Sequence, residues 1–300
     1  MADTDISFSS GDVTLHGSLR VPAASDGNVP AVLLLAGSGP TDRNGDSALL
    51  PGPIGTLRHL ADVLERNGFA SLRYDKLGSG VTGLGPYDVA DVADLGFSTF
   101  IDAATDGLRF LAAQPGIDAE RLYVVGHSEG ALIALTLADA GAPVAGVTFS
   151  DACEPARPVP LLAFHGTLDP ILLFNGGVGD SLNSVLDSGD IGAVDVRGVP
   201  IPEADLRGEG YPAATQAWAE RNGCEGEGDD VDVTDTVIRR TWECPEGAEV
   251  EFWIVEGGGH TWPGSEFSAS LERVMASTDL SISANEEMWA FFQRFALPAT

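Results

Sequence analysis

The chain has 300 residues, and its 45 acidic side chains outnumber 16 Lys and Arg residues to give a formal net charge of -29. This balance excludes a nucleic-acid-binding surface and a contact with anionic membranes, because both need clustered basic side chains. The length and a hydrophobic content of 44% predict one large α/β domain over residues 1–300, with a sizeable core.

Targeting segments and metal-binding spacings are absent from the sequence as written. Arg20 is the first Lys or Arg, so no signal-peptide pattern is present, and no apolar run is long enough to span a bilayer. A cytoplasmic location is therefore the default expectation. Cys153, Cys224 and Cys244 lack C-x-x-C spacing, which disfavours a zinc or redox centre. They permit at most one internal disulfide, which would need an oxidising compartment.

Strands and helices are expected to alternate through the N-terminal half. Residues 6–10 and 13–21 alternate in polarity around a Gly-Asp pair and predict an antiparallel hairpin. Residues 31–36 form a continuous apolar run, typical of a strand buried on both faces. Further strands are expected at 69–74 and 122–125, and helices through 57–64, over 99–114 and over 131–140.

The C-terminal half continues this alternation with one interruption. Residues 170–210 are rich in Gly, Asp and Pro and predict a lid or cap over the sheet edge where substrates bind. The acidic run 225–235 is expected to be a solvated loop. Only about a dozen residues connect the expected strand at 144–149 to the one at 161–164, so the crossover between them is expected to lack a full helix. The other expected elements are strands at 144–149, 161–164, 234–242 and 249–255, and helices at 212–221 and 285–295.

This order of elements predicts the fold class. Short apolar strands that alternate with helices form a doubly wound, mostly parallel sheet. The N-terminal hairpin adds antiparallel strands to it.

Residues 126–130 read G-x-S-x-G between a predicted strand and a predicted helix. Gly126 and Gly130 lack side chains, so strand and helix can approach closely and Ser128 can be pushed into the solvent-facing cleft. The N-terminus of the following helix stabilises negative charge that develops beside it. The pattern favours Ser128 as a catalytic nucleophile over an ordinary turn serine.

A serine nucleophile needs a base and an acid that orients the base. The chain order expected for a strand–turn–helix serine is Ser, acid, His. His260, in a Gly-rich segment after the strand at 249–255, is the expected base. Asp169 follows the strand at 161–164 and is the expected acid, with an Asx turn as the alternative. His165 is expected to be structural, because a base there would precede its own carboxylate.

The negative charge formed during acyl transfer needs two preorganised N–H donors. The backbone of Glu129, directly after the nucleophile, is expected to supply one donor. Ser38, in the Gly-rich turn after the strand at 31–36, is the best candidate for the other, and Gly37 is the second. Gly37 is also expected to border the substrate.

Two further segments are expected near the site. Trp262 lies two residues after His260 and either forms an aromatic wall for an acyl or aryl group or packs the His260 loop. The two alternatives stay open. Residues 75–80, after the strand at 69–74, are expected to form a supporting loop, with direct substrate contact less favoured.

From about Cys153 onward the chain resembles the polyhydroxybutyrate depolymerase-like and feruloyl-esterase-like secreted esterases. The segments that carry the resemblance are 158–170, 174–177, 222–224 and 258–264, together with Trp218. The resemblance implies that Asp169 and His260 belong to a catalytic triad and that Cys224 and Cys244 pair. It also implies secretion if the chain has been trimmed.

The N-terminal half is similar to general bacterial α/β-hydrolase esterases that act on small esters. Residues 35–45, 72–76 and 126–130 carry this second resemblance. Ala36 and Gly37 stand where the depolymerase-like group usually has a His-Gly pair. The two halves therefore agree on fold and triad and differ in the substrate they imply.

Both resemblances imply an α/β-hydrolase fold and a serine esterase that needs no metal or organic cofactor. The expected partner is a small-molecule or oligomeric ester, of small, aryl or polyester type. A peptidase or amide acylase with the same triad is an alternative. A catalytically inactive binding protein with this fold is another.

Overall fold

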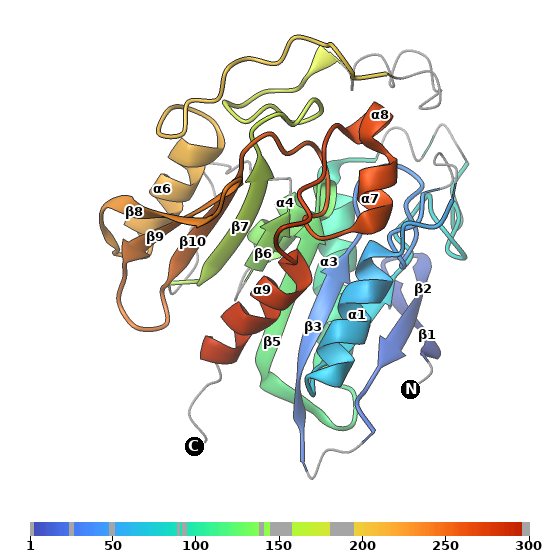
Figure 1. Ribbon diagram of the computed structural model, residues 1–300. Helices are drawn as coiled ribbons and strands as arrows, with labels where there is room; N and C mark the ends of the chain where they lie inside the picture. Colours follow the sequence, from blue (N-terminus) through green and yellow to red (C-terminus); the bar gives the residue numbers. More distant parts are fainter. Residues whose placement is uncertain are drawn as a thin grey trace. The chain divides into compact units, whose positions relative to one another are not determined.

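The computed structural model describes residues 3–23, 27–47, 52–88, 91, 95–137, 141–144, 158–180 and 195–295. The chain divides into two units, Met1–Ala140 with Trp289–Thr300, and Gly141–Met288. Each unit combines strands with helices (Figure 1).

The first unit holds the N-terminal hairpin and the first parallel strands. β1 pairs antiparallel with β2, and β2 pairs antiparallel with β4. β3 pairs in parallel with both β4 and β5. The predicted hairpin and buried parallel strand are confirmed. The strand order is β1 (Thr4–Ser10), β2 (Val13–Arg20), β4 (Ala70–Tyr74), β3 (Val29–Leu35) and β5 (Ile117–His127).

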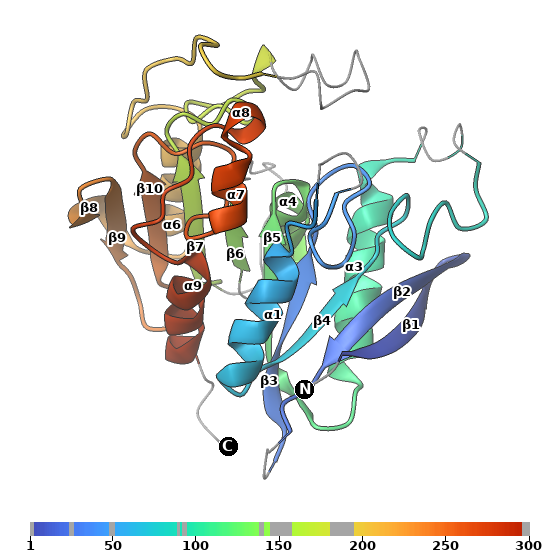
Figure 2. The ribbon, with the colours of Figure 1, turned by 45° about the vertical axis from the view of Figure 1, so that its right-hand side comes forward.

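Helices cover both faces of these strands. α1 lies on one face, and α3 and α4 lie on the other (Figures 1 and 2). Leu57, Leu60 and Leu64 follow helical spacing on α1 and are fully buried. Burial of each such leucine contributes about 2 kcal/mol. The helices are α1 (Thr56–Arg66), α3 (Phe97–Ala112) and α4 (Glu129–Leu137).

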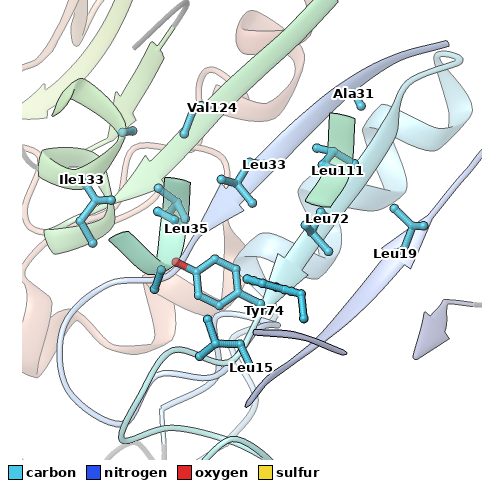
Figure 3. Close-up of a cluster of buried hydrophobic side chains, with 14 of the residues drawn as sticks. Leu15, Leu19, Ala31, Leu33, Leu35, Leu72, Tyr74, Leu111, Val124 and Ile133 are labelled. Carbon is cyan, nitrogen blue, oxygen red and sulfur yellow. The ribbon is translucent and has the colours of Figure 1, made fainter. Parts of the chain in front are cut away.

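The core of the first unit lies between its strands and α3. Side chains alternate along a strand, so Leu33 and Leu35 of β3 share one face. They belong to one buried cluster with Leu72, Tyr74 and Leu111 (Figure 3). This packing holds the C-terminal ends of β3 and β5 beside each other, where the predicted nucleophile and donor loops begin.

The second unit continues with parallel strands and ends in an antiparallel edge. β7 pairs in parallel with β6 and with β10, whereas β9 pairs antiparallel with β10 and with β8. The strand order is β6 (Gly141–Val144), β7 (Leu161–Gly166), β10 (Val250–Val255), β9 (Val237–Glu243) and β8 (Glu225–Thr234). The helices are α6 (Tyr211–Arg221), α7 (Glu266–Ser270), α8 (Glu272–Met275) and the start of α9 (Ala284–Phe292). The end of α9, from Trp289, and the 3-10 turn η2 (Gln293–Phe295) belong to the first unit.

The expectation of a loop over residues 225–235 is wrong, because Glu225–Thr234 form the strand β8. Its register against β9 places Asp230 opposite Arg240, and their side chains pair at 2.6 Å. The remaining carboxylates of β8 are mostly exposed. Charges on an edge strand discourage further strand pairing. The high charge that indicated a loop therefore belongs to a protected sheet edge.

Several expectations fall partly on residues outside the described ranges. The strand at 144–149 and the short crossover before residue 161 lie there, apart from the end of β6 at Val144. Within residues 170–179 and 195–210 the structure has turns and an isolated bridge between Leu172 and Val178. The role of residues 170–210 as a lid stays a prediction. Over the described ranges, no helix combines the length and apolar character needed to cross a membrane.

Cys224 and Cys244 form a disulfide with a sequence separation of 20. The bond lies at the base of the β8–β9 hairpin, where Glu225 pairs with Glu243. It is the pairing that the resemblance to the secreted esterases implies.

Removal of this disulfide is expected to lower the free energy of unfolding by about 3 kcal/mol, because the open loop gains entropy in the unfolded chain. The test is urea denaturation of the Cys224→Ser/Cys244→Ser double variant. Cys153→Ser is the matched control, since it removes a cysteine and keeps the bond. Equal unfolding midpoints for the double variant and this control would contradict the expectation.

Candidate active site

Ser128 occupies a strained turn between β5 and α4. Its φ is 54°, in the left-handed region, and among the described residues the only other non-glycine residue there is Ala276. This conformation costs about 1–2 kcal/mol for a residue with a side chain. Non-glycine residues held in this region cluster at functional sites. The strain therefore marks Ser128 as a functional candidate in the structure as well as in the sequence.

The two glycines of the G-x-S-x-G motif are required by close backbone contacts. A Cβ on Gly126 would lie 2.0 Å from the carbonyl oxygen of Gly130. A Cβ on Gly130 would lie 2.4 Å from the carbonyl oxygen of Leu35. Neither position has room for a side chain, so β3, β5 and α4 meet backbone to backbone around Ser128.

The predicted oxyanion loop lies beside this turn, within the first unit. A Cβ on Gly37 would lie 3.3 Å from the Cβ of Ser128, so the two backbones approach closely. Ser38 follows and is exposed. Glu129 is the first residue of α4, and N–H groups in a first helical turn have no acceptor within the helix. The structure thus brings together the predicted nucleophile and the segments of both predicted donors.

A buried aspartate joins the segment after β3 to the loop after β4. Asp75 is 1% exposed and accepts hydrogen bonds from the Arg43 guanidinium at 2.7 Å and from the Val81 N–H at 2.8 Å. The Arg43 N–H adds a further bond of 2.8 Å. Sequence reasoning did not single out Arg43. The available signal was one basic residue between Asp42 and Asp46 in an otherwise acidic chain.

Asp169 and His260 form a buried pair in the second unit. His260 Nδ1 lies 2.8 Å from Asp169 Oδ2, and the N–H groups of Ile171 and Leu172 donate to Oδ1 at 2.8 Å each. Burial acts to raise the pKa of Asp169, but His260 and the backbone donors outweigh it and hold the pKa below its usual value. The ionised carboxylate can therefore accept a hydrogen bond from Nδ1–H of His260, which favours the tautomer with its proton on Nδ1.

Strand neighbours explain why residues so far apart in the sequence meet. β7 and β10 are adjacent and parallel, so the loops that follow them leave the same edge of the sheet. A Cβ on Gly166 would lie 2.2 Å from the carbonyl oxygen of Gly258. A Cβ on Gly259 would lie 2.0 Å from the carbonyl oxygen of Met275. These glycines allow the close approach that sets Asp169 against His260.

His165 is a buried, neutral side chain beside Asp169 of the Asp169–His260 pair. Its Nε2 lies 2.9 Å from the Leu172 carbonyl oxygen and 3.5 Å from Asp169 Oδ2, and its ring stacks on Tyr211 at 3.5 Å. Burial lowers the pKa of His165 to about 4, although Asp169 acts in the opposite direction. A neutral ring that donates from Nε2 fits the structural role expected for this residue.

This burial predicts a loss of stability in weak acid. Below pH 6.5 an unfolded chain takes up a proton on His165, whereas the folded chain resists protonation until about pH 4. Folding is expected to weaken by on the order of 3 kcal/mol as the pH falls through this window. Asp169 adds a loss of the same sign at lower pH, as the pH falls below the ordinary carboxyl pKa of 3.8, because its lowered pKa stabilises the folded state only while it is ionised.

The measurement is the unfolding free energy of His165→Gln across this pH range, since glutamine does not titrate. A shallower pH dependence than that of the unmodified protein is expected. His59→Gln is the matched control, because the side chain of His59 is 59% exposed. Parallel curves for the unmodified protein and His165→Gln would contradict the assignment.

Trp262 is 2% exposed, and its indole N–H donates to the Asn285 side chain at 2.9 Å. This arrangement favours packing of the His260 loop over an aromatic wall that contacts substrate.

Among the described residues, no group of three or more His, Cys, Asp and Glu side chains is placed to hold a metal ion. Ser128 belongs to the first unit, whereas Asp169 and His260 belong to the second.

Comparison with known proteins agrees with this architecture. Residues 32–273 match the model of the alpha/beta hydrolase family. The chain belongs to the α/β hydrolase family. The phosphotriesterase P91 from metagenomic libraries, described as dienelactone hydrolase-like, has a TM-score of 0.57 with this hydrolase. The match covers 97% of this chain and 96% of P91 at 15% identity, a likeness of fold alone.

Relatives of this hydrolase carry esterase names. NocK of Nocardia uniformis subsp. tsuyamanensis, named as a putative esterase, is 28% identical over a match of 284 residues. The match covers 90% of this hydrolase and 75% of NocK. Feruloyl esterase B of Piromyces equi is 28% identical over 171 residues. The hydrolase spans 27% of the length of that enzyme, and the match covers 51% of the hydrolase. These relatives support a hydrolase or esterase activity.

Proposed function

We propose that this hydrolase is a serine carboxylic-ester hydrolase with Ser128, Asp169 and His260 as its triad. The left-handed conformation of Ser128 between two glycines that tolerate no side chain is the observation that carries the proposal. A strained turn of this kind presents the hydroxyl at the top of the sheet. The buried Asp169–His260 pair supplies the matching base.

The proposed reaction follows from these groups. His260 Nε2 removes the proton of Ser128 while Oγ attacks the ester carbonyl, and Asp169 stabilises the imidazolium that forms. The N–H groups of Ser38 and Glu129 bind the oxyanion of the tetrahedral intermediate. His260 returns its proton to the leaving alcohol, and a water activated by the same imidazole then cleaves the acyl-enzyme.

The proposed substrates are small, aryl or polyester-type esters. An aryl acyl group is supported by the match to feruloyl esterase B. Acidic substrates are disfavoured by the net charge of -29, which repels anions from the surface as a whole.

Two assays test the proposal. A fluorophosphonate probe should modify the intact protein once, and peptide mapping should place the adduct on Ser128. A substrate panel should include p-nitrophenyl acetate to decanoate, methyl ferulate, a hydroxybutyrate oligomer and aminoacyl p-nitroanilides. The absence of both labelling and ester turnover would reject the proposal. Faster cleavage of the anilides would replace esterase with amidase activity on the same residues.

A further inference from the structure

Lys76 is the only lysine of the chain, and it is buried beside the predicted oxyanion loop. It lies just after β4, and its side chain is 7% exposed. Its Nζ donates a hydrogen bond to the carbonyl oxygen of Gly37. The same nitrogen lies 3.6 Å from the Glu129 carboxylate and 5.9 Å from the centre of the Phe100 ring.

Burial of an ammonium group is unfavourable by several kcal/mol unless charges and acceptors compensate it. Burial lowers the pKa of Lys76, and the Glu129 carboxylate acts against this shift. A methionine-sized apolar side chain would fill the same space without that penalty. The position of Lys76 therefore raises the question of what its contacts do.

The contact with Gly37 determines the direction of the Ser38 N–H. The carbonyl of Gly37 and the N–H of Ser38 belong to one planar trans peptide unit and point in opposite directions. When Lys76 holds the carbonyl, the N–H is held pointing away from Lys76. The Ser38 residue itself is exposed. A cationic partner on the carbonyl also polarises the peptide and strengthens its N–H as a donor.

The contact with Glu129 ties the second donor to the same nitrogen. Glu129 opens α4 directly after Ser128, and its backbone is the other predicted oxyanion donor. Its side chain turns back to Lys76. One buried cation therefore links the two segments that must hold a fixed separation when an oxyanion binds between them.

We propose that Lys76 is a positioning residue that preorganises the Ser38 and Glu129 N–H groups for the oxyanion. This inference rests on the proposed ester hydrolysis and adds a residue to it. Lys76 does not touch substrate in this role, because its hydrogen bond ends on the Gly37 carbonyl. The competing view is that Lys76 only neutralises Glu129 and stabilises the fold.

The two views differ in transition-state binding. Lys76→Met is expected to lower kcat for p-nitrophenyl acetate by about 10- to 100-fold. This loss should not exceed the loss of kcat that removal of one oxyanion donor causes. KM is expected to change little, since the ground-state carbonyl uses the oxyanion site weakly. An alkyl trifluoromethyl ketone, which forms a tetrahedral adduct, is expected to lose affinity by a similar factor. Active sites are counted with the fluorophosphonate probe so that only folded enzyme is compared.

Two companion variants keep the test decisive if Lys76→Met folds poorly. Lys76→Met/Glu129→Gln leaves no unpaired buried charge and still lacks the cation on Gly37, so it should show the same loss of kcat. Lys76→Arg keeps a cationic donor and should recover part of kcat and of ketone affinity. Arg20→Met is the matched control, because it removes a buried cation that pairs with Asp3 at 2.7 Å in the same unit. It should lower the melting temperature and leave kcat unchanged.

The outcomes separate this inference from the proposed function. If the unmodified protein hydrolyses esters and the folded Lys76 variants keep kcat and ketone affinity within about threefold of the Arg20→Met control, the positioning role is wrong. If the unmodified protein neither hydrolyses esters nor binds the ketone, the proposed function itself is wrong. Loss of kcat and ketone affinity together, with partial recovery in Lys76→Arg, supports the positioning role.

Discussion

Replacement of Ser128 by alanine is expected to lower kcat for p-nitrophenyl acetate by about 10⁵- to 10⁶-fold. The reason is that no other group replaces an attacking oxygen at the turn between β5 and α4. Only the rate supplied by substrate binding and the oxyanion donors should remain. The measurement is steady-state turnover together with loss of the fluorophosphonate adduct.

The backbone strain at Ser128 provides a folding control for this variant. Its φ of 54° disfavours alanine as much as serine, whereas glycine adopts it without penalty. Ser128→Gly is therefore expected to be about 1 kcal/mol more stable than Ser128→Ala and equally inactive. Ester turnover that survives in both folded variants would show that Ser128 is not the nucleophile.

Replacement of Asp169 by asparagine is expected to lower kcat by about 10⁴-fold. Oδ1 of Asp169 holds the N–H groups of Ile171 and Leu172, so the new amide oxygen is expected to occupy that position. The amide nitrogen then faces Nδ1 of His260, which can no longer donate to an acceptor there. His260 is forced into the other tautomer, and its Nε2 carries a proton when it should accept one.

Steady-state kinetics from pH 6 to 10 test this expectation. A rate that rises with pH would indicate that deprotonation restores some base function. Asp230→Asn is the matched control, because Asp230 also pairs through its carboxylate, at 2.6 Å with Arg240 on the edge hairpin. It should keep full kcat. A loss of less than about tenfold in Asp169→Asn would argue against Asp169 as the orienting acid.

Much of the fold was predictable because its signals are local. A continuous apolar run marks a strand buried on both faces, and such a run at 31–36 became β3 (Val29–Leu35). The strand and helix around Ser128 followed from the two glycines that flank it. The edge strand β8 was missed because pairing with β9, through Asp230 and Arg240, overrides the local preference of an acidic, Gly-rich segment for a loop.

The residue types of the candidate site were predictable from the sequence, whereas the packing around them was not. Chain order and resemblance singled out Asp169 and His260, whose side chains lie 2.8 Å apart in the structure. The sequence left Trp262 open between two roles, and its burial and its bond to Asn285 favour packing. Such distinctions depend on which side chains are covered, and that is a property of the packed chain.

The amino-acid sequence by itself predicted the class of chemistry that we propose, since a serine nucleophile, an acid and a histidine are expected to follow strands in a set order in this fold. Only the tertiary structure decided how these groups are held. Lys76 contacts Gly37 and Glu129, which lie 39 and 53 positions away from it along the chain. No local sequence pattern around these three residues indicates the contacts. The physical reason is that local sequence patterns encode turns and periodicity, whereas the order in which the strands pack decides which distant residues contact a buried charge.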